Sequence, residues 1–176
     1  MLLHTRIIWE KAWRIRVDTV QLPSGRTTER AAVEHPGSVV LVPLQEKDEE
    51  PYILTLRQYR FTLQQTIVEL PAGTRDWDEP WLECAQRELR EETGYRAADF
   101  IPLGHIWPAP GITDEEMAIF LATGLTADPL PADEDEELIV ESILLSELVA
   151  MAMDGRLQDA KSVVAILRTA AYLNDQ

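Results

Sequence analysis

The chain has 176 residues, and 31 acidic side chains against 16 basic ones give it a formal net charge of −15. This charge argues against general nucleic-acid binding, which needs a cationic surface, and no apolar run approaches the 18 residues of a membrane span. The single cysteine, Cys84, excludes an internal disulfide, and the N-terminus lacks a signal-peptide pattern, so we expect a cytoplasmic protein.

The first 35 residues predict a small antiparallel sheet around the turn signal Pro23-Ser24-Gly25. Its two large aromatics, Trp9 and Trp13, either plug a face of this sheet or make a dimer contact or stack on a substrate base. The expected strands are Arg6–Glu10, Ala12–Leu22 and Thr28–Glu34, of which the last two would form a hairpin.

Three strands are expected next. Ser38–Leu44 is an almost continuous apolar run and predicts a buried central strand, followed by Tyr52–Tyr59 and Thr66–Leu70. Arg57 and Arg60 lie at the end of the second of these strands. They either balance an acidic surface or clamp a diphosphate, because a guanidinium grips phosphate oxygens with two hydrogen bonds.

A helix is expected to begin at Pro80, capped by Asp78 or Glu79, and to end at Thr93 before Gly94. Its core stripe is predicted to be Leu82, Ala85 and Leu89. Its other face carries Glu88, Glu91 and Glu92, at i, i+3 and i+4. These glutamates are either a solvated acidic face or ligands for Mg²⁺ or Mn²⁺, which take oxygen donors.

The spacing around this helix is that of the Nudix box, GX5EX7REUXEEXGU. It is met by Gly73, Glu79, the Arg87-Glu88-Leu89 run, Glu91-Glu92 and Gly94, while Tyr95 stands where an aliphatic residue is usual. The chance of such a match in a chain of this length is on the order of 10⁻⁷. The chain therefore resembles the Nudix hydrolases, which cleave nucleoside diphosphates linked to another group and use divalent metal.

The resemblance implies roles for residues of the box. Glu88, Glu91, Glu92 and the carbonyl oxygen of Ala72 would bind the metal ions, with Glu91 and Glu92 taking part in catalysis. Arg87 would hold the neighbouring carboxylates of Glu79 or Glu91 in place.

Two further features resemble the ADP-ribose pyrophosphatase branch of the family, namely the sequence RQYR at residues 57–60 and Pro110, fifteen positions beyond the box. That likeness favours Arg57, and less firmly Arg60, as substrate-binding residues. In this branch the general base often lies on a late loop, which places it on Glu136, with Glu134 and Glu137 open by register.

The rest of the chain predicts strands at Phe100–Trp107 and Met117–Ala122, then helices at Glu147–Met153, capped by Ser146, and at Asp159–Leu173. The acidic run at residues 114–116 could face the active site, although a solvated turn is the simpler interpretation.

The expected fold is an α/β/α sandwich with a mixed sheet and an N-terminal antiparallel extension. We divide it into residues 1–35, an extension that dimerises, and residues 36–176, the hydrolase domain. The leading function is hydrolysis of ADP-ribose or a related nucleotide sugar to AMP and ribose 5-phosphate. The alternatives are GDP-mannose or another nucleotide sugar as substrate, and a catalytically inactive nucleotide sensor.

Overall fold

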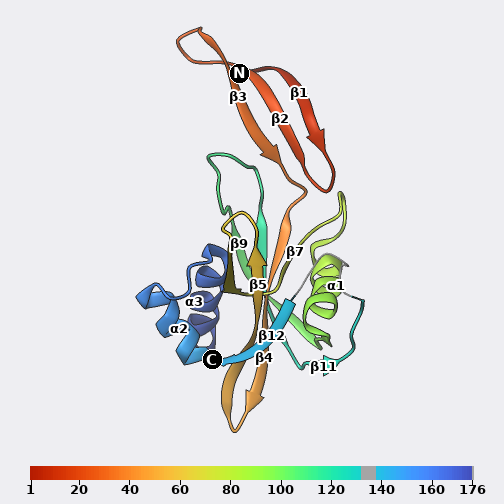
Figure 1. Cartoon of the computed structure of the whole chain (residues 1–176), viewed down its shortest axis with the longest axis vertical. Helices are drawn as coiled ribbons and strands as arrows, with labels where there is room; N and C mark the ends of the chain where they lie inside the picture. Colours follow the sequence, from red (N-terminus) through yellow and green to blue (C-terminus); the bar gives the residue numbers. More distant parts are fainter. Residues whose placement is uncertain (132–137, 176) are drawn as a thin grey trace.

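The computed structural model describes residues 1–131 and 138–175. Its first three strands form a separate antiparallel sheet, in the order β1-β2-β3, that projects from the rest of the molecule (Figure 1). Their bounds are Leu2–Glu10 for β1, Arg14–Gln21 for β2 and Thr27–Glu34 for β3. Arg14 of β2 is paired with Glu34 of β3, so the expected hairpin is confirmed.

The projecting sheet is tied to the body through the loop of residues 107–116. The backbone of Val33 exchanges hydrogen bonds with this loop, accepting from Asp114 N at 3.2 Å and donating to Ile112 O at 2.8 Å. Arg16 adds an ion pair with Asp114, at 3.2 Å between Nη1 and Oδ2. Contacts at β2 and β3 therefore fix the end of the sheet that lies nearest the body.

The central sheet has seven strands and is mixed, because β10 runs parallel to β4 while the other pairs are antiparallel. Its order is β12-β5-β4-β10-β9, with β6 paired to β5 and β7 paired to β4. The bounds are Ser38–Lys47 (β4), Glu50–Arg60 (β5), Gln65–Glu69 (β6), Ala72–Thr74 (β7), Asp99–Ile106 (β9), Met117–Thr123 (β10) and Leu138–Leu144 (β12). A short pair, Tyr95–Arg96 (β8) with Thr126–Ala127 (β11), lies beside it.

Helices cover both faces of the central sheet, with α1 on one side and α2 and α3 on the other (Figure 1). They span Trp81–Thr93 (α1), Leu145–Asp154 (α2) and Ala160–Asn174 (α3). Strand β4 supplies both cores, since Val40 packs toward α2 and α3 while Val39 packs toward α1. The expected α/β/α sandwich with an N-terminal extension is confirmed. In the described part of the chain, no helix has the length and apolar character needed to cross a membrane.

Three sequence predictions about helix starts and faces are wrong. Helix α1 begins at Trp81 with Pro80 as its N-cap residue, and no side chain caps it, because proline has no side-chain acceptor; the Glu79 carboxylate accepts from Arg87 instead. Leu82 is 46% exposed, and Trp81 instead packs in the first turn, so close to Gly37 that a Cβ there would lie 2.5 Å from the ring. Helix α2 begins at Leu145, so Ser146 lies inside it rather than capping it.

Cys84 is fully buried in the core beside α1. Burial raises the pKa of its thiol, so the unreactive thiol form dominates at neutral pH. We expect no measurable labelling by a thiol-specific disulfide reagent in the native protein at pH 8, and labelling of one thiol per chain in denaturant, followed by absorbance. Rapid labelling of the native protein would contradict the buried position.

Candidate active site

A cavity of about 760 Å³ opens between the box helix α1, strand β7 and the near end of the projecting sheet. Its lining is strongly charged and brings together acidic and basic side chains from α1 and from other elements. The charged lining residues are Glu88, Glu91, Glu92, Glu115, Asp76, Arg60, Arg75, Arg87 and Lys161. Such a mixture suits a ligand that carries both metal-binding oxygens and negative charge.

The predicted metal ligands all line this cavity, namely the side chains of Glu88, Glu91 and Glu92 and the residue Ala72, whose carbonyl oxygen is the fourth predicted ligand. Glu88 and Glu92 are almost buried, at 8% and 7% exposure, and Glu91 is half-buried. The Glu92 carboxylate accepts a hydrogen bond from the Ala72 backbone N–H at 2.8 Å. This contact joins the last turn of α1 to strand β7.

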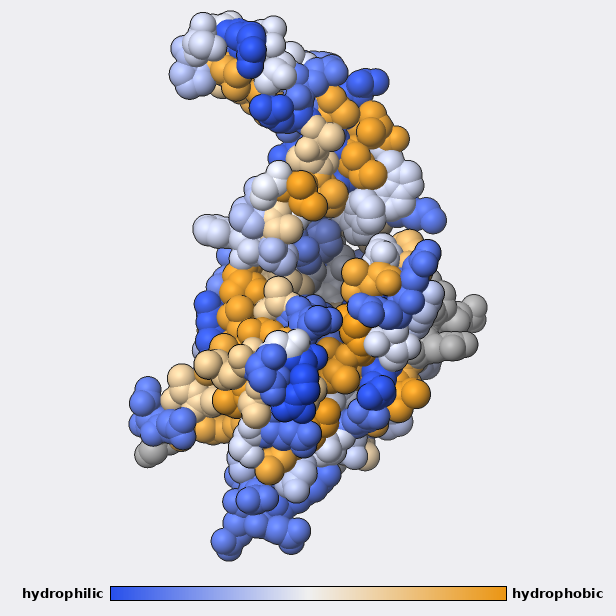
Figure 2. Space-filling view, turned by 60° about the vertical axis from the view of Figure 1, so that its left-hand side comes forward, coloured by the Kyte–Doolittle hydropathy of each residue, from blue (hydrophilic) through white to orange (hydrophobic). Residues whose placement is uncertain are grey.

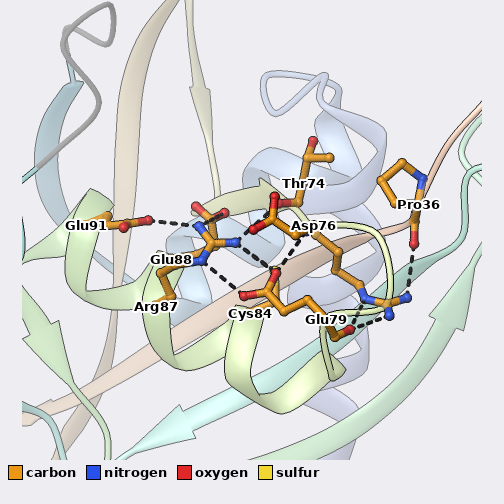
Figure 3. A network of polar contacts seen from close by, with 9 residues as sticks. Pro36, Thr74, Asp76, Glu79, Cys84, Arg87, Glu88 and Glu91 are labelled. Carbon is orange, nitrogen blue, oxygen red and sulfur yellow. Dashed lines mark hydrogen bonds and ion pairs between the residues drawn. The ribbon is translucent and has the colours of Figure 1, made fainter. Parts of the chain in front are cut away.

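Arg87 connects the glutamates to one another (Figure 3). Its Nη1 donates to Glu88 at 2.7 Å and to Glu91 at 3.0 Å. Its Nε and Nη2 donate to the two oxygens of Glu79, at 3.1 and 3.0 Å. Arg87 thus contacts both carboxylates that the resemblance assigned to it, and Glu88 in addition.

The charges of this network stabilise one another. The hydrogen bond to Glu79 raises the pKa of Arg87 against the opposing effect of burial. Burial favours the neutral acid of Glu79, but the hydrogen bonds from Arg87 and from the Asp76 backbone outweigh it and lower the pKa of Glu79. Glu79 is therefore ionised at neutral pH and holds the guanidinium beside the cavity.

Gly73 occupies the centre of β7 opposite Val39, directly against the Glu88 carboxylate. A Cβ at position 73 would lie 1.8 Å from Cδ of Glu88 and 2.0 and 2.1 Å from its two oxygens. These distances are far below any possible contact, so the glycine of the box leaves the space that this carboxylate fills.

The acidic residues of the cavity fit a hard divalent cation, because they offer carboxylate oxygens as ligands. The absence of a side chain at Gly73 leaves room for one of these carboxylates, that of Glu88. In residues 1–131 and 138–175, no three side chains of the ligand types His, Cys, Asp and Glu are already grouped around a single point. Arg87 instead shares Glu88 and Glu91, so a bound cation would compete with its guanidinium for their oxygens.

The two arginines of the RQYR sequence point to different places. Arg60 lines the cavity, whereas the cavity lining does not include Arg57. Arg57 forms an ion pair with Glu141 at 3.0 Å between Nε and Oε1, with both side chains well exposed. Neighbouring side chains of a strand alternate between its faces, so residues three apart in β5 face opposite ways. The substrate role of Arg57 stays a prediction.

In the acidic run at residues 114–116 only Glu115 lines the candidate active site, whereas the side chains of Asp114 and Glu116 are 44% and 43% exposed. Glu115 lines the cavity and accepts a hydrogen bond from Ser38 Oγ at 2.6 Å. Asp114 pairs with Arg16, and Glu116 lies 3.1 Å from His105 Nδ1. The sequence could not single out Glu115 or Asp114, because their partners Ser38 and His35 lie 77 and 79 positions away along the chain.

The remaining predicted residues are placed as follows. Trp13 lines the cavity, at the end of the projecting sheet, with its ring centroid 4.4 Å from that of Trp9. Glu136, and the open alternatives Glu134 and Glu137, lie outside the described residues. Arg75 and Lys161 are cavity residues that sequence reasoning missed.

The chain is similar to known proteins in sequence and in fold. The NUDIX domain family matches residues 34–165. A methanol dehydrogenase activator of Bacillus methanolicus is 35% identical over 155 residues, which cover 87% of this chain and 82% of that protein. An ADP-ribose pyrophosphatase of Bacillus subtilis is 35% identical over 152 residues, covering 85% and 80%. A crystal structure of an ADP compounds hydrolase shares the fold, with a TM-score of 0.84 at 22% identity over 100% of this chain and 95% of that one.

Proposed function

The chain belongs to the Nudix hydrolase family, and from this premise we propose that it cleaves the diphosphate bond of ADP-ribose or a related nucleoside diphosphate sugar. The products from ADP-ribose would be AMP and ribose 5-phosphate. The observation that carries the proposal is the joining of Glu88, Glu91 and Glu92 with basic side chains in one cavity. The similarity to an ADP-ribose pyrophosphatase supports the choice of substrate.

Nudix hydrolases use divalent metal, and we propose Mg²⁺ or Mn²⁺ held by Glu88, Glu91, Glu92 and the Ala72 carbonyl. Such ions neutralise diphosphate oxygens and make a bound water more acidic. Arg87 would keep the carboxylates in place while the ions are absent, because its hydrogen bonds already hold Glu88 and Glu91. We keep Glu136 as the proposed general base for the attacking water.

Arg60 lines the cavity, and its guanidinium can donate two hydrogen bonds to the oxygens of an anionic diphosphate. Trp13 offers an aromatic ring in the cavity lining, which supports a role in stacking on the adenine base. Arg57 would contribute in the same complex if the substrate extends toward β12 and Glu141.

A product assay tests this function. We expect purified protein with Mg²⁺ to release AMP faster from ADP-ribose than from GDP-mannose, NADH or diadenosine polyphosphates, as measured by chromatography of the nucleotides. Excess EDTA should reduce the rate by at least about 10²-fold, because metal supplies several kcal/mol of transition-state stabilisation. Fastest turnover of GDP-mannose would agree with metal-dependent diphosphate hydrolysis but would reject ADP-ribose as the preferred substrate. Binding of nucleotides without any turnover would support the sensor alternative.

We further propose a cytoplasmic homodimer assembled through the extension of residues 1–35. Every residue of β1 is exposed, although the strand is rich in apolar side chains, and Figure 2 places apolar surface on the projecting part. Ile8 is 53% exposed and Leu3 47%. Apolar area of this kind is common at protein interfaces. The cytoplasmic location rests on the single cysteine.

We expect Ile8→Asp to shift the protein from dimer to monomer in light scattering coupled to size exclusion, because a charge would have to be buried in the contact. Met153→Asp is the matched control, since Met153 is an exposed apolar residue (74%) of α2, in the body of the molecule. A wild-type protein that is already monomeric at about 100 μM would contradict the dimer proposal.

A further inference from the structure

A buried carboxylate outside the Nudix box joins two basic side chains of the cavity wall. Glu69, at the end of β6, is 2% exposed. Arg60 donates to it from Nε and from Nη2, both at 2.8 Å. Lys161 Nζ donates to the same carboxylate at 2.5 Å, from a position 92 residues along the chain. Arg60 and Lys161 both line the cavity.

Lys161 is itself held by the first turn of α3. Its Nζ also donates to Asp159 Oδ2 at 2.9 Å. Asp159 is the N-cap of that helix, where it accepts the Ser162 N–H at 3.1 Å. Ser162 Oγ accepts the Leu70 N–H at 2.7 Å. The first turn of α3 therefore forms hydrogen bonds with Glu69 and Leu70, just before strand β7, which contains Ala72 and Gly73.

The hydrogen-bond pattern gives Arg60 a defined direction. Its two bonds to Glu69 use Nε and Nη2, and within the described residues Nη1 has no acceptor at hydrogen-bonding distance. Burial opposes the charge of Arg60, but the hydrogen bonds to Glu69 outweigh it and raise the pKa of Arg60. A guanidinium fixed along one edge keeps its remaining N–H donors aligned for an anionic oxygen.

Charge balance at this wall depends on Lys161. Arg60 and Lys161 carry two positive charges, and Glu69 and Asp159 carry two negative ones. Removal of the ammonium leaves an excess negative charge beside the cavity and takes one partner from a buried carboxylate. Glu69 would then have only Arg60 to hold it among these four residues.

We infer that Lys161 is a positioning residue for substrate binding. Through Glu69, it holds Arg60 with Nη1 toward the cavity and keeps the wall neutral, so that Arg60 can bind a phosphate oxygen of the substrate. This inference rests on the proposed function for the identity of the ligand, a nucleoside diphosphate sugar. Lys161 acts on binding, while the carboxylates of α1 serve the chemical step.

The test compares Lys161→Met with wild type by calorimetric Kd for ADP-ribose in EDTA and by steady-state kinetics with Mg²⁺. We expect Kd and KM to rise about tenfold, equal to about 1.4 kcal/mol, while kcat changes less than about threefold. Lys161→Arg should restore part of the affinity because it keeps the charge. Lys47→Met is the matched control, since Lys47 is exposed and lies outside the cavity lining.

A double-mutant cycle separates positioning from a general loss of stability. If Lys161 acts through Arg60, Lys161→Met should change Kd by less than about twofold in an Arg60→Gln background. Equal Kd values for wild type and Lys161→Met would overturn the inference. So would the absence of measurable ADP-ribose binding by both proteins. Independent effects of the two substitutions, or a lower Tm with unchanged Kd, would also overturn it. Absence of wild-type turnover would reject the proposed function, and the Kd comparison would still decide this inference.

Discussion

Glu92→Gln is expected to lower kcat for ADP-ribose by about 10³-fold, because a neutral amide cannot replace a carboxylate that binds Mg²⁺. The substitution keeps the size of the side chain, and the amide oxygen can still accept the Ala72 N–H that Glu92 accepts at 2.8 Å. The fold should therefore be retained, with a change in Tm of no more than a few degrees. Steady-state rates and thermal unfolding of the same preparation measure both quantities.

Glu83→Gln provides the matched control, since Glu83 is an exposed glutamate of the same helix α1. Its kcat should stay within about twofold of wild type, as expected for a surface change away from the cavity. Titration with Mg²⁺ adds a second readout, because a lost ligand raises the concentration needed for half-maximal rate. A Glu92→Gln enzyme with the wild-type rate and the wild-type Mg²⁺ requirement would reject the assignment of Glu92 to the metal.

The sequence was informative wherever function depends on local spacing. The box places Glu88, Glu91 and Glu92 on one side of a single helix, so their meeting in the cavity needs no knowledge of the rest of the fold. The apolar run Ser38–Leu44 likewise identified the central strand. Leu82, which is 46% exposed, shows that an apolar stripe does not tell which residues of the first helical turn pack against the sheet.

Long-range contacts account for the residues that were missed. Lys161 meets Glu69 across 92 positions, and its helix could be recognised only as an apolar stripe. The polar group Asp159, Lys161 and Ser162 at the start of that helix was the available signal, because such residues cap helices and bind nearby chain segments. Arg57 and Arg60 could have been separated from sequence, since residues three apart in a strand face opposite sides.

Gly73→Ala is expected to lower kcat by at least about 10²-fold while leaving the protein folded, since displacement of a catalytic group by about 1 Å has costs of that size. The new Cβ would overlap the Glu88 carboxylate, with 1.8 Å to its Cδ. This carboxylate is the mobile end of its side chain and can move away, so the cost in stability should be small. The displacement would also break its 2.7 Å hydrogen bond with Arg87.

Two comparisons identify displacement of Glu88 as the cause. Gly111→Ala is the control, because a Cβ at Gly111 meets no atom within 4 Å in the described structure, and its kcat should stay within about twofold of wild type. In a Glu88→Ala background, Gly73→Ala should add little further loss, because the group it displaces is already gone. Full additivity of the two losses would mean that Gly73 serves the cavity in another way, through the backbone of β7 and its pairing with Val39.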